Sequence, residues 1–232
     1  METKTVETKH GDFLIKIIQD TSPLNPRKEW DNIGSMICWH RRYDLGDKHN
    51  YSDTIDLFAS IAGVDAEEFE DRKSELRALV EEKAIILPLY LYDHSGITMS
   101  TGSFSCPWDS GQVGWIYIRK DDENYIAWGK QKEWLNGRTL EQAAIDALTG
   151  EVETYDQYLT GDVYGFKVLD PEGEEIHSCW GYFGYDHDES GLMDEATNAI
   201  ECEVERMDEK ENEKLEEIGC QVYGEHFNTI KL

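Results

Sequence analysis

The sequence "LPLYLYDHSGITMSTGSFSCPWDSGQVGWIYIRK" (residues 87–120) has two strand-like ends and a turn-rich centre. The ends are rich in Leu, Ile, Tyr and Trp, which favour strands with a buried face. The centre contains Gly, Ser, Thr and Pro, which favour turns. We therefore expect this stretch to form the rigid centre of a sheet, with a candidate site at its turn. Pro88 in the first run predicts a sheet edge or a bulge.

Strands are predicted within this stretch and on both sides of it, because short apolar or alternating runs recur along the chain. They lie at residues 12–20, 33–43, 84–93, 96–101, 113–120, 162–169, 175–183 and 220–232. The runs 162–169 and 175–183 flank the turn sequence "PEGE", which predicts a hairpin.

Helices are predicted where apolar residues recur at helical spacing after a capping residue. They lie at residues 52–63, 66–83, 139–161 and 192–219, and residues 121–137 are expected to be helical in part. The expected N-caps are Ser52, Asp65 and Thr139, and the expected ends are Gly63 and Gly161.

The combined pattern predicts an α+β fold with a mostly antiparallel sheet and packed helices. We expect a single domain over residues 1–232, with a long acidic C-terminal helix at 192–219 and a flexible segment at 1–10.

Charge is the most unusual property of the chain. It has 49 Asp and Glu against 22 Lys and Arg, for a net charge of −27 and a pI near 4.4. Residues 121–232 carry 29 of the acids and 8 of the bases. Such a chain repels nucleic acid and anionic membranes and attracts basic surfaces. Solubility or adaptation to salt is the alternative explanation.

Cysteine usage and hydropathy predict where the protein acts. The five cysteines are odd in number and include no C-x-x-C pair, which argues against a disulfide framework or a zinc ribbon. The N-terminus has no apolar signal-like segment, and no apolar run approaches the roughly 18 residues of a membrane span. We therefore expect a cytoplasmic protein with reduced thiols and no membrane association.

Four blocks of the chain have distinctive amino-acid sequences. They are "EWDNIGSMICWHRRYDLGD" (29–47), "ILPLYLYDHSGITMSTGSFSCPWDSGQVGWIYI" (86–118), "EVETYDQYLTGDVYGF" (151–166) and "SCWGYFG" (178–184). Together they resemble an uncharacterised family of proteins from bacteriophages, plasmids and integrated mobile elements. The resemblance implies a mobile-element origin and expression in the cytoplasm of a bacterial host. It implies no activity.

The acidic charge, combined with that origin, favours an inhibitor that is not an enzyme. Carboxylates spaced like phosphates can occupy a DNA-binding surface, as DNA-mimic antirestriction proteins do. The expected partner is a basic nucleic-acid-handling host protein, such as a defence or restriction component, with no direct contact to nucleic acid. The expected contact residues are Glu201, Glu205, Asp208, Glu209 and Glu213. Alternatively, 192–219 is a solvated amphipathic helix, with an inward face at Ala196, Ile200, Val204, Met207, Leu215 and Ile218.

A second hypothesis is a small-ligand or hydrolytic protein with a nucleotide pocket near residues 87–120, which we call the opening stretch. His94, Cys106 and Asp109 would form a base, nucleophile and orienting group, although "SCPWD" matches no cysteine-hydrolase signature. Arg41 and Arg42 would bind an anion, unless they pair with the chain's own carboxylates. A third hypothesis is a structural or regulatory subunit used in the element's own replication.

Two weaker patterns complete the candidate sites. The segments "DHSG" and "DHDES" offer metal-binding atoms, but at no recognised spacing, so neither a metal nor another cofactor is predicted. Gly161, Gly165, Gly181 and Gly184 lie among aromatic residues, which would allow a flat ligand to approach. An aromatic core under a twisted hairpin is the alternative.

Overall fold

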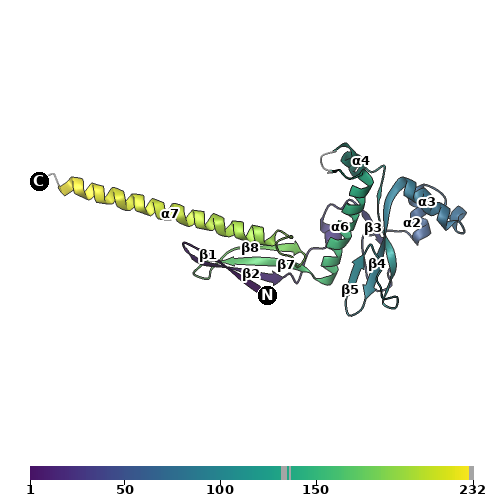
Figure 1. The fold of residues 1–232 in the computed structure, drawn as a ribbon, viewed down its shortest axis with the longest axis horizontal. Coiled ribbons are helices and arrows are strands. Elements are labelled where there is room, and N and C mark those ends of the chain that lie inside the picture. Colours follow the sequence, from purple (N-terminus) through teal and green to yellow (C-terminus); the bar gives the residue numbers. More distant parts are fainter. Residues whose placement is uncertain (132–134, 136, 230–232) are drawn as a thin grey trace. The chain divides into compact units, whose positions relative to one another are not determined.

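The computed structural model describes residues 1–131, 135 and 137–229 (Figure 1). Within the last of these ranges, side chains are described for residues 137–216 and 218. It has an α+β fold with two antiparallel sheets, which confirms the predicted fold class but not the expectation of one sheet. Contacts within the fold define two compact units. We call Leu24–Asp162 the central unit, and Met1–Pro23 together with the chain from Val163 onward the terminal unit.

The sheet of the central unit consists mostly of the opening stretch. Its strands are β3 (Ser35–Cys38), β4 (Ala84–Asp93), β5 (Ile97–Ser100) and β6 (Ser110–Arg119), in the order β3-β6-β4-β5. Pro88 lies in β4, which is an inner strand, and the register shifts between Leu89 and Tyr90. The bulge predicted as one alternative is therefore present beside Pro88. Because β5 pairs only with Tyr90–Asp93, Pro88 itself has a strand partner among the described residues on one side alone, as the predicted sheet edge requires.

Helices cover both faces of this sheet because neighbouring strand residues alternate between the faces. Met36 and Ile116 pack with α6 (Leu140–Thr160). Ile37 and Ile86 pack in a second cluster with α2 (Thr54–Ala62) and α3 (Lys73–Lys83). The short α1 (Pro26–Glu29) precedes β3, and α4 (Glu123–Lys130) follows β6. Figure 1 shows α6 on one side of the strands and α2 and α3 on the other.

Capping residues explain the helix ends, with two corrections. Thr139 caps α6 and Gly161 ends it in the left-handed conformation, as predicted. Asp53, and not Ser52, caps α2, because its carboxylate accepts the first free backbone N–H groups. The helix predicted over 66–83 is divided into the 3-10 helix η1 (Ala66–Phe69), which Asp65 caps, and α3. Part of the predicted 121–137 helix, residues 132–134 and 136, lies outside the described residues.

The terminal unit is a second four-stranded sheet with a long helix. Its strands are β1 (Glu2–Thr8), β2 (Gly11–Gln19), β7 (Val163–Leu169) and β8 (Glu175–Phe183), in the order β1-β2-β7-β8. The hairpin β7–β8 confirms the prediction from "PEGE". The helix α7 (Leu192–Thr229) buries Leu192, Ala196 and Ile200 against this sheet and continues beyond it (Figure 1).

Both ends of the chain differ from expectation. Residues 1–10, expected to be flexible, contain β1, because every residue from Glu2 to Thr8 pairs with β2. The segment 220–232, expected to be a strand, continues α7 as far as Thr229, and residues 230–232 lie outside the described part. Adding residues to an existing helix avoids the unfavourable nucleation of a new element.

Candidate functional site

Four glutamates form an exposed row along α7. Glu201, Glu205, Glu209 and Glu213 are all exposed and follow one another at four-residue intervals. Because an α-helix rises about 1.5 Å per residue, successive members lie about 6 Å apart along the axis. Residues four apart also face neighbouring directions around the helix. We call these four residues the acidic row; they share one broad side of α7.

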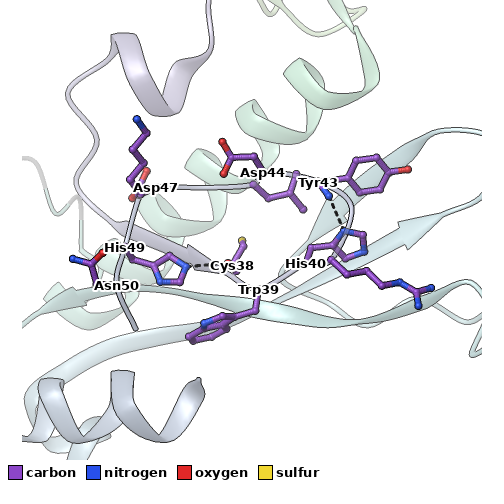
Figure 2. A pocket seen from close by; sticks show the side chains of 11 residues that line it. Cys38, Trp39, His40, Tyr43, Asp44, Asp47, His49 and Asn50 are labelled. Atoms are coloured by element: carbon purple, nitrogen blue, oxygen red, sulfur yellow. Dashed lines mark hydrogen bonds between the residues drawn. The ribbon is translucent and has the colours of Figure 1, made fainter. Parts of the chain in front are cut away.

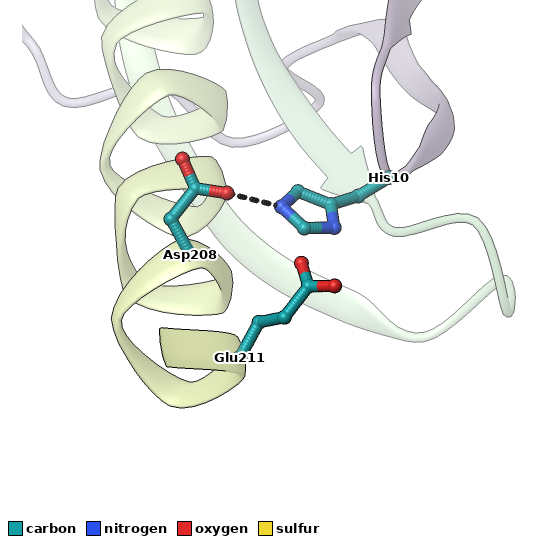
Figure 3. Close-up of side chains that lie close together, drawn as sticks. All are labelled: His10, Asp208 and Glu211. Atoms are coloured by element: carbon teal, nitrogen blue, oxygen red, sulfur yellow. Dashed lines mark hydrogen bonds and ion pairs between the residues drawn. The ribbon is translucent and has the colours of Figure 1, made fainter. Parts of the chain in front are cut away.

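Asp208, the fifth predicted contact residue, is not part of this row. Its side chain faces the β1–β2 turn, where Oδ1 lies 2.6 Å from His10 Nε2 (Figure 3). Its second oxygen, Oδ2, lies 2.5 Å from Lys9 Nζ. Hydrogen bonds from Lys9 and then His10 lower the pKa of Asp208 below its usual value. Asp208 therefore fastens α7 to the sheet, and its charge is compensated within the chain.

The same place gathers the atoms most able to hold a metal ion. Single donor atoms of His10, Asp208 and Glu211 lie within 4.8 Å of one another, and no other group of three is found among the described residues. One imidazole and two carboxylates suit a divalent cation such as Zn²⁺ or Mn²⁺. The ammonium of Lys9 on Asp208 opposes such an ion. Sequence analysis missed this cluster because His10 and Asp208 are 198 residues apart.

The inward face of α7 is only half as long as the amphipathic alternative predicted. Ala196 and Ile200 are buried, and Val204 and Met207 are partly buried against the terminal sheet. Leu215 is 61% exposed and Ile218 is 57% exposed. The helix has passed the end of the sheet by these positions, so its apolar residues meet solvent.

The opening stretch does bring the predicted nucleophilic set together, but in a different order. Asp109 Oδ2 lies 3.7 Å from Cys106 Sγ and 3.3 Å from His94 Nδ1. The carboxylate is therefore the central group, and no contact joins His94 to Cys106 within the described part of the chain. Nucleophilic catalysis needs the base in contact with the nucleophile, held by a third group. In this arrangement the candidate base His94 does not contact the candidate nucleophile Cys106, and the His94 side chain is 63% exposed.

The neighbouring arginines have separate surroundings. Arg42 forms an ion pair with Asp93, whose second oxygen accepts a hydrogen bond of 3.3 Å from the Tyr43 hydroxyl. Arg42 is thus compensated by the chain's own charge, as one alternative predicted. Arg41 lines a pocket formed by the chain between β3 and α2. The two residues therefore do not form one anion site.

The glycine-rich aromatic hairpin is packed by rings of its own chain at Gly165. Gly165 in β7 pairs with Trp180 in β8, and a Cβ at Gly165 would lie 2.3 Å from the Trp180 ring. Phe166 is buried and contacts the rings of His177 and Tyr182. At Gly165 the space is filled by the Trp180 ring, which agrees with the interpretation as an aromatic core, whereas a Cβ at Gly181 would meet no described atom within 4 Å.

Among the described helices, none combines the length and apolar composition that crossing a bilayer requires. No protein-family model, curated protein or solved structure matches this chain.

Proposed function

We propose that this protein, from a bacteriophage or another mobile element, binds and blocks a basic nucleic-acid-handling protein in the cytoplasm of its bacterial host. A component of a defence or restriction system is the expected target. The acidic row on α7 is the contact surface. The observation that supports this most directly is the exposure of all four glutamates on a helix that continues past its sheet.

The carboxylates of α7 are spaced along the helix axis about as closely as the phosphates of a nucleic-acid strand. Ten acidic residues occur from Asp194 to Glu216, a length of about 33 Å at the helical rise. This is one carboxylate per roughly 3.5 Å, and one strand of B-DNA carries one phosphate per roughly 3.4 Å. Arg206, Lys210 and Lys214 lie in the same range and reduce its net charge to −7, so a protein surface that binds phosphates would meet a similar spacing of carboxylates but a lower net charge along α7.

The surroundings of the row strengthen the field that a basic partner would meet. The segments of the terminal unit carry 23 acidic and 8 basic residues, a net charge of −15. A folded helix presents its carboxylates in fixed positions, which lowers the entropic cost of binding. The summed charge would also accelerate encounter with a basic surface, and salt would weaken this effect.

The experiment compares two variants with the same change in total charge. One reverses the acidic row (E201K/E205K/E209K/E213K), and the other reverses four exposed acids near η1 (E67K/E68K/E70K/D71K). Tagged proteins are used to capture partners from nuclease-treated host lysate at about 50 and 500 mM salt. The captured proteins are identified by mass spectrometry, and inhibition of the purified partner's nucleic-acid binding is then measured.

We expect the wild type and the η1 variant to capture and inhibit a nucleic-acid-binding protein at low salt. The acidic-row variant should lose both properties, and high salt should release the partner from the wild type. Equal behaviour of the two variants would show that bulk charge alone attracts proteins and would contradict a specific role for α7. A wild-type protein that inhibits no captured partner would contradict the proposed function.

A further inference from the structure

The chain between β3 and α2 surrounds a pocket in the central unit (Figure 2). Its volume is about 780 Å³, within the range of roughly 300 to 1,000 Å³ that is usual for small-molecule sites. Residues 38–50 provide the whole lining. The pocket is therefore complete within one continuous segment.

Buried contacts hold this segment in one conformation. The Asp47 carboxylate accepts hydrogen bonds from Arg27 Nε at 3.0 Å, Arg27 Nη2 at 2.6 Å and the Met36 backbone N–H at 2.7 Å. Gly46 has a φ of 69°, and a Cβ there would lie 2.5 Å from the Met36 carbonyl oxygen. The Tyr155 hydroxyl accepts the Gly46 N–H at 3.1 Å. The pocket is thus preformed, and Arg27, which also pairs with Glu151, compensates the charge of Asp47 only in part.

The cationic residues of the pocket are unusual in this acidic chain. All eight arginines lie in the described ranges, and seven of them form an ion pair with a carboxylate. Arg41 is the exception, and it lines the pocket together with Lys48, which also forms no ion pair with any described residue. Asp44 lies on the same lining and offsets one of these two charges. Arg41 and Lys48 are therefore the two cationic side chains of the lining that an anion would meet without a competing ion pair to a described residue.

One histidine offers a further polar group to a ligand, and a second has a buried ring nitrogen without a described partner. His40 Nδ1 accepts the Tyr43 backbone N–H at 3.2 Å, so Nε2 carries the ring proton and can donate. His49 Nε2 lies 3.0 Å from the Cys38 carbonyl oxygen and must donate to it, which leaves Nδ1 as an acceptor. His49 Nδ1 is buried and has no partner among the described residues. A buried polar atom without a partner is costly unless a ligand or water pairs with it.

Flat side chains complete the lining. The rings of His40 and Tyr43 are stacked with centroids 4.9 Å apart. The Trp39 indole is fixed by a hydrogen bond of 2.9 Å from Nε1 to the Tyr51 carbonyl oxygen. Aromatic faces of this kind bind planar rings by stacking. Burial raises the pKa of the Cys38 thiol, also in the lining, to about 12, so this group adds no negative charge at neutral pH.

We propose that this pocket binds a mononucleotide, with Arg41 and Lys48 holding the phosphate and the aromatic side chains holding the base. The pocket volume exceeds the needs of a single inorganic anion. A nucleic-acid polymer would meet the repulsion of a chain with net charge −27. A small molecule with one phosphate avoids most of that repulsion.

The test uses the purified full chain and isothermal titration calorimetry. The probes are the four ribonucleoside 5′-monophosphates, the matching nucleosides and inorganic phosphate. We expect at least one monophosphate to bind saturably, and its nucleoside and inorganic phosphate to bind at least about tenfold more weakly. A nucleoside that binds as tightly as its monophosphate would overturn the assignment of Arg41 and Lys48. Absence of saturable binding up to about millimolar concentration would overturn the whole site.

Arg42 provides a matched control for Arg41. Both side chains are exposed and adjacent in sequence, but only Arg41 lines the pocket. Arg41→Ala should weaken the monophosphate at least about tenfold, whereas Arg42→Ala should change its affinity less than about twofold. Lys48→Ala is a second variant with the same expected loss, and thermal unfolding confirms that each variant folds. Equal affinities of the Arg41 and Arg42 variants would overturn the proposal.

Discussion

Arg27 connects α1 to three other segments of the central unit, two of them 20 and 124 residues away in sequence. Its guanidinium is 1% exposed and contacts Asp47, Glu151 and the Gly34 carbonyl oxygen. Burial lowers the pKa of Arg27, but the contacts with Asp47 and Glu151 raise it above the ordinary value. Glu151 also accepts the Ile33 backbone N–H at 2.6 Å. One buried charge therefore connects α1, the start of β3, the pocket segment and α6.

Replacing Arg27 should strongly destabilise the protein. Arg27→Met would leave two partly buried carboxylates without their partner, which typically costs about 3 to 5 kcal/mol of unfolding free energy. Urea unfolding followed by circular dichroism measures this cost. Arg138→Met is the control, since Arg138 is exposed and pairs with Asp146 at the surface, where about 1 kcal/mol or less is expected. Similar costs for both variants would contradict the organising role of Arg27.

Cys38 should be unreactive while the protein is folded. Burial and then the charge of Asp47 raise its pKa to about 12, whereas a cysteine in an unfolded chain has a pKa of about 8.5. Since only the thiolate reacts, Cys38 should resist alkylation by iodoacetamide from pH 7 to 9.5, and exposed Cys202 should react faster as the pH rises. Peptide mapping by mass spectrometry distinguishes the two sites. Cys38 should become reactive in urea; rapid labelling of the folded protein at pH 8 would contradict the raised pKa.

At the scale of secondary-structure elements, α7 is one helix with two different environments. Its first turns bury apolar residues on the terminal sheet, and Asp208 fastens it to the β1–β2 turn. Beyond that point its described side chains are exposed, including apolar Leu215. The acidic row extends across this change, from Glu201 above the sheet to Glu213 beyond it.

Two substitutions in α7 should have very different effects on stability. Ile200→Ala would create a cavity at a side chain that is 2% exposed, and it should lower the unfolding free energy by about 2 to 5 kcal/mol. Leu215→Ala should change it by about 0.5 kcal/mol or less, because Leu215 is mostly exposed and alanine favours helices. Urea unfolding of both variants tests the difference. A large cost at Leu215 would show that the distal part of α7 is covered in solution.

At the scale of the whole molecule, charge repulsion opposes the folded state. The net charge of −27 is held at higher density in the folded chain than in the unfolded chain. Ion pairs compensate most arginines, but they leave a large excess of carboxylates on both units. Screening by salt should therefore relieve more repulsion than attraction.

The midpoint of thermal unfolding, Tm, should therefore rise with salt concentration. Raising sodium chloride from about 0.05 to 0.5 M should increase Tm, because the Debye length falls below typical distances between surface carboxylates. Differential scanning calorimetry measures the shift. The η1 variant described above, with a net charge of −19, should show a smaller shift than the wild type. A Tm that falls with added salt would show that attractive pairs dominate.

Local patterns by themselves determined much of the secondary structure of this protein. The hairpin β7–β8 and the ends of α6 at Thr139 and Gly161 follow from turn and capping chemistry within a few residues. Apolar runs likewise located β4 and β6, because burial imposes its periodicity on the sequence. The grouping of His94, Cys106 and Asp109 was also predicted, since a turn brings these positions together.

Only the tertiary structure decided how these elements and their side chains meet. It divided the strands into two sheets, made residues 2–8 a paired strand, and placed Asp109 between His94 and Cys106. It also separated Arg41 from Arg42 and turned Asp208 towards His10. These outcomes depend on contacts between residues far apart in the chain and on side-chain directions in loops, which no local periodicity encodes.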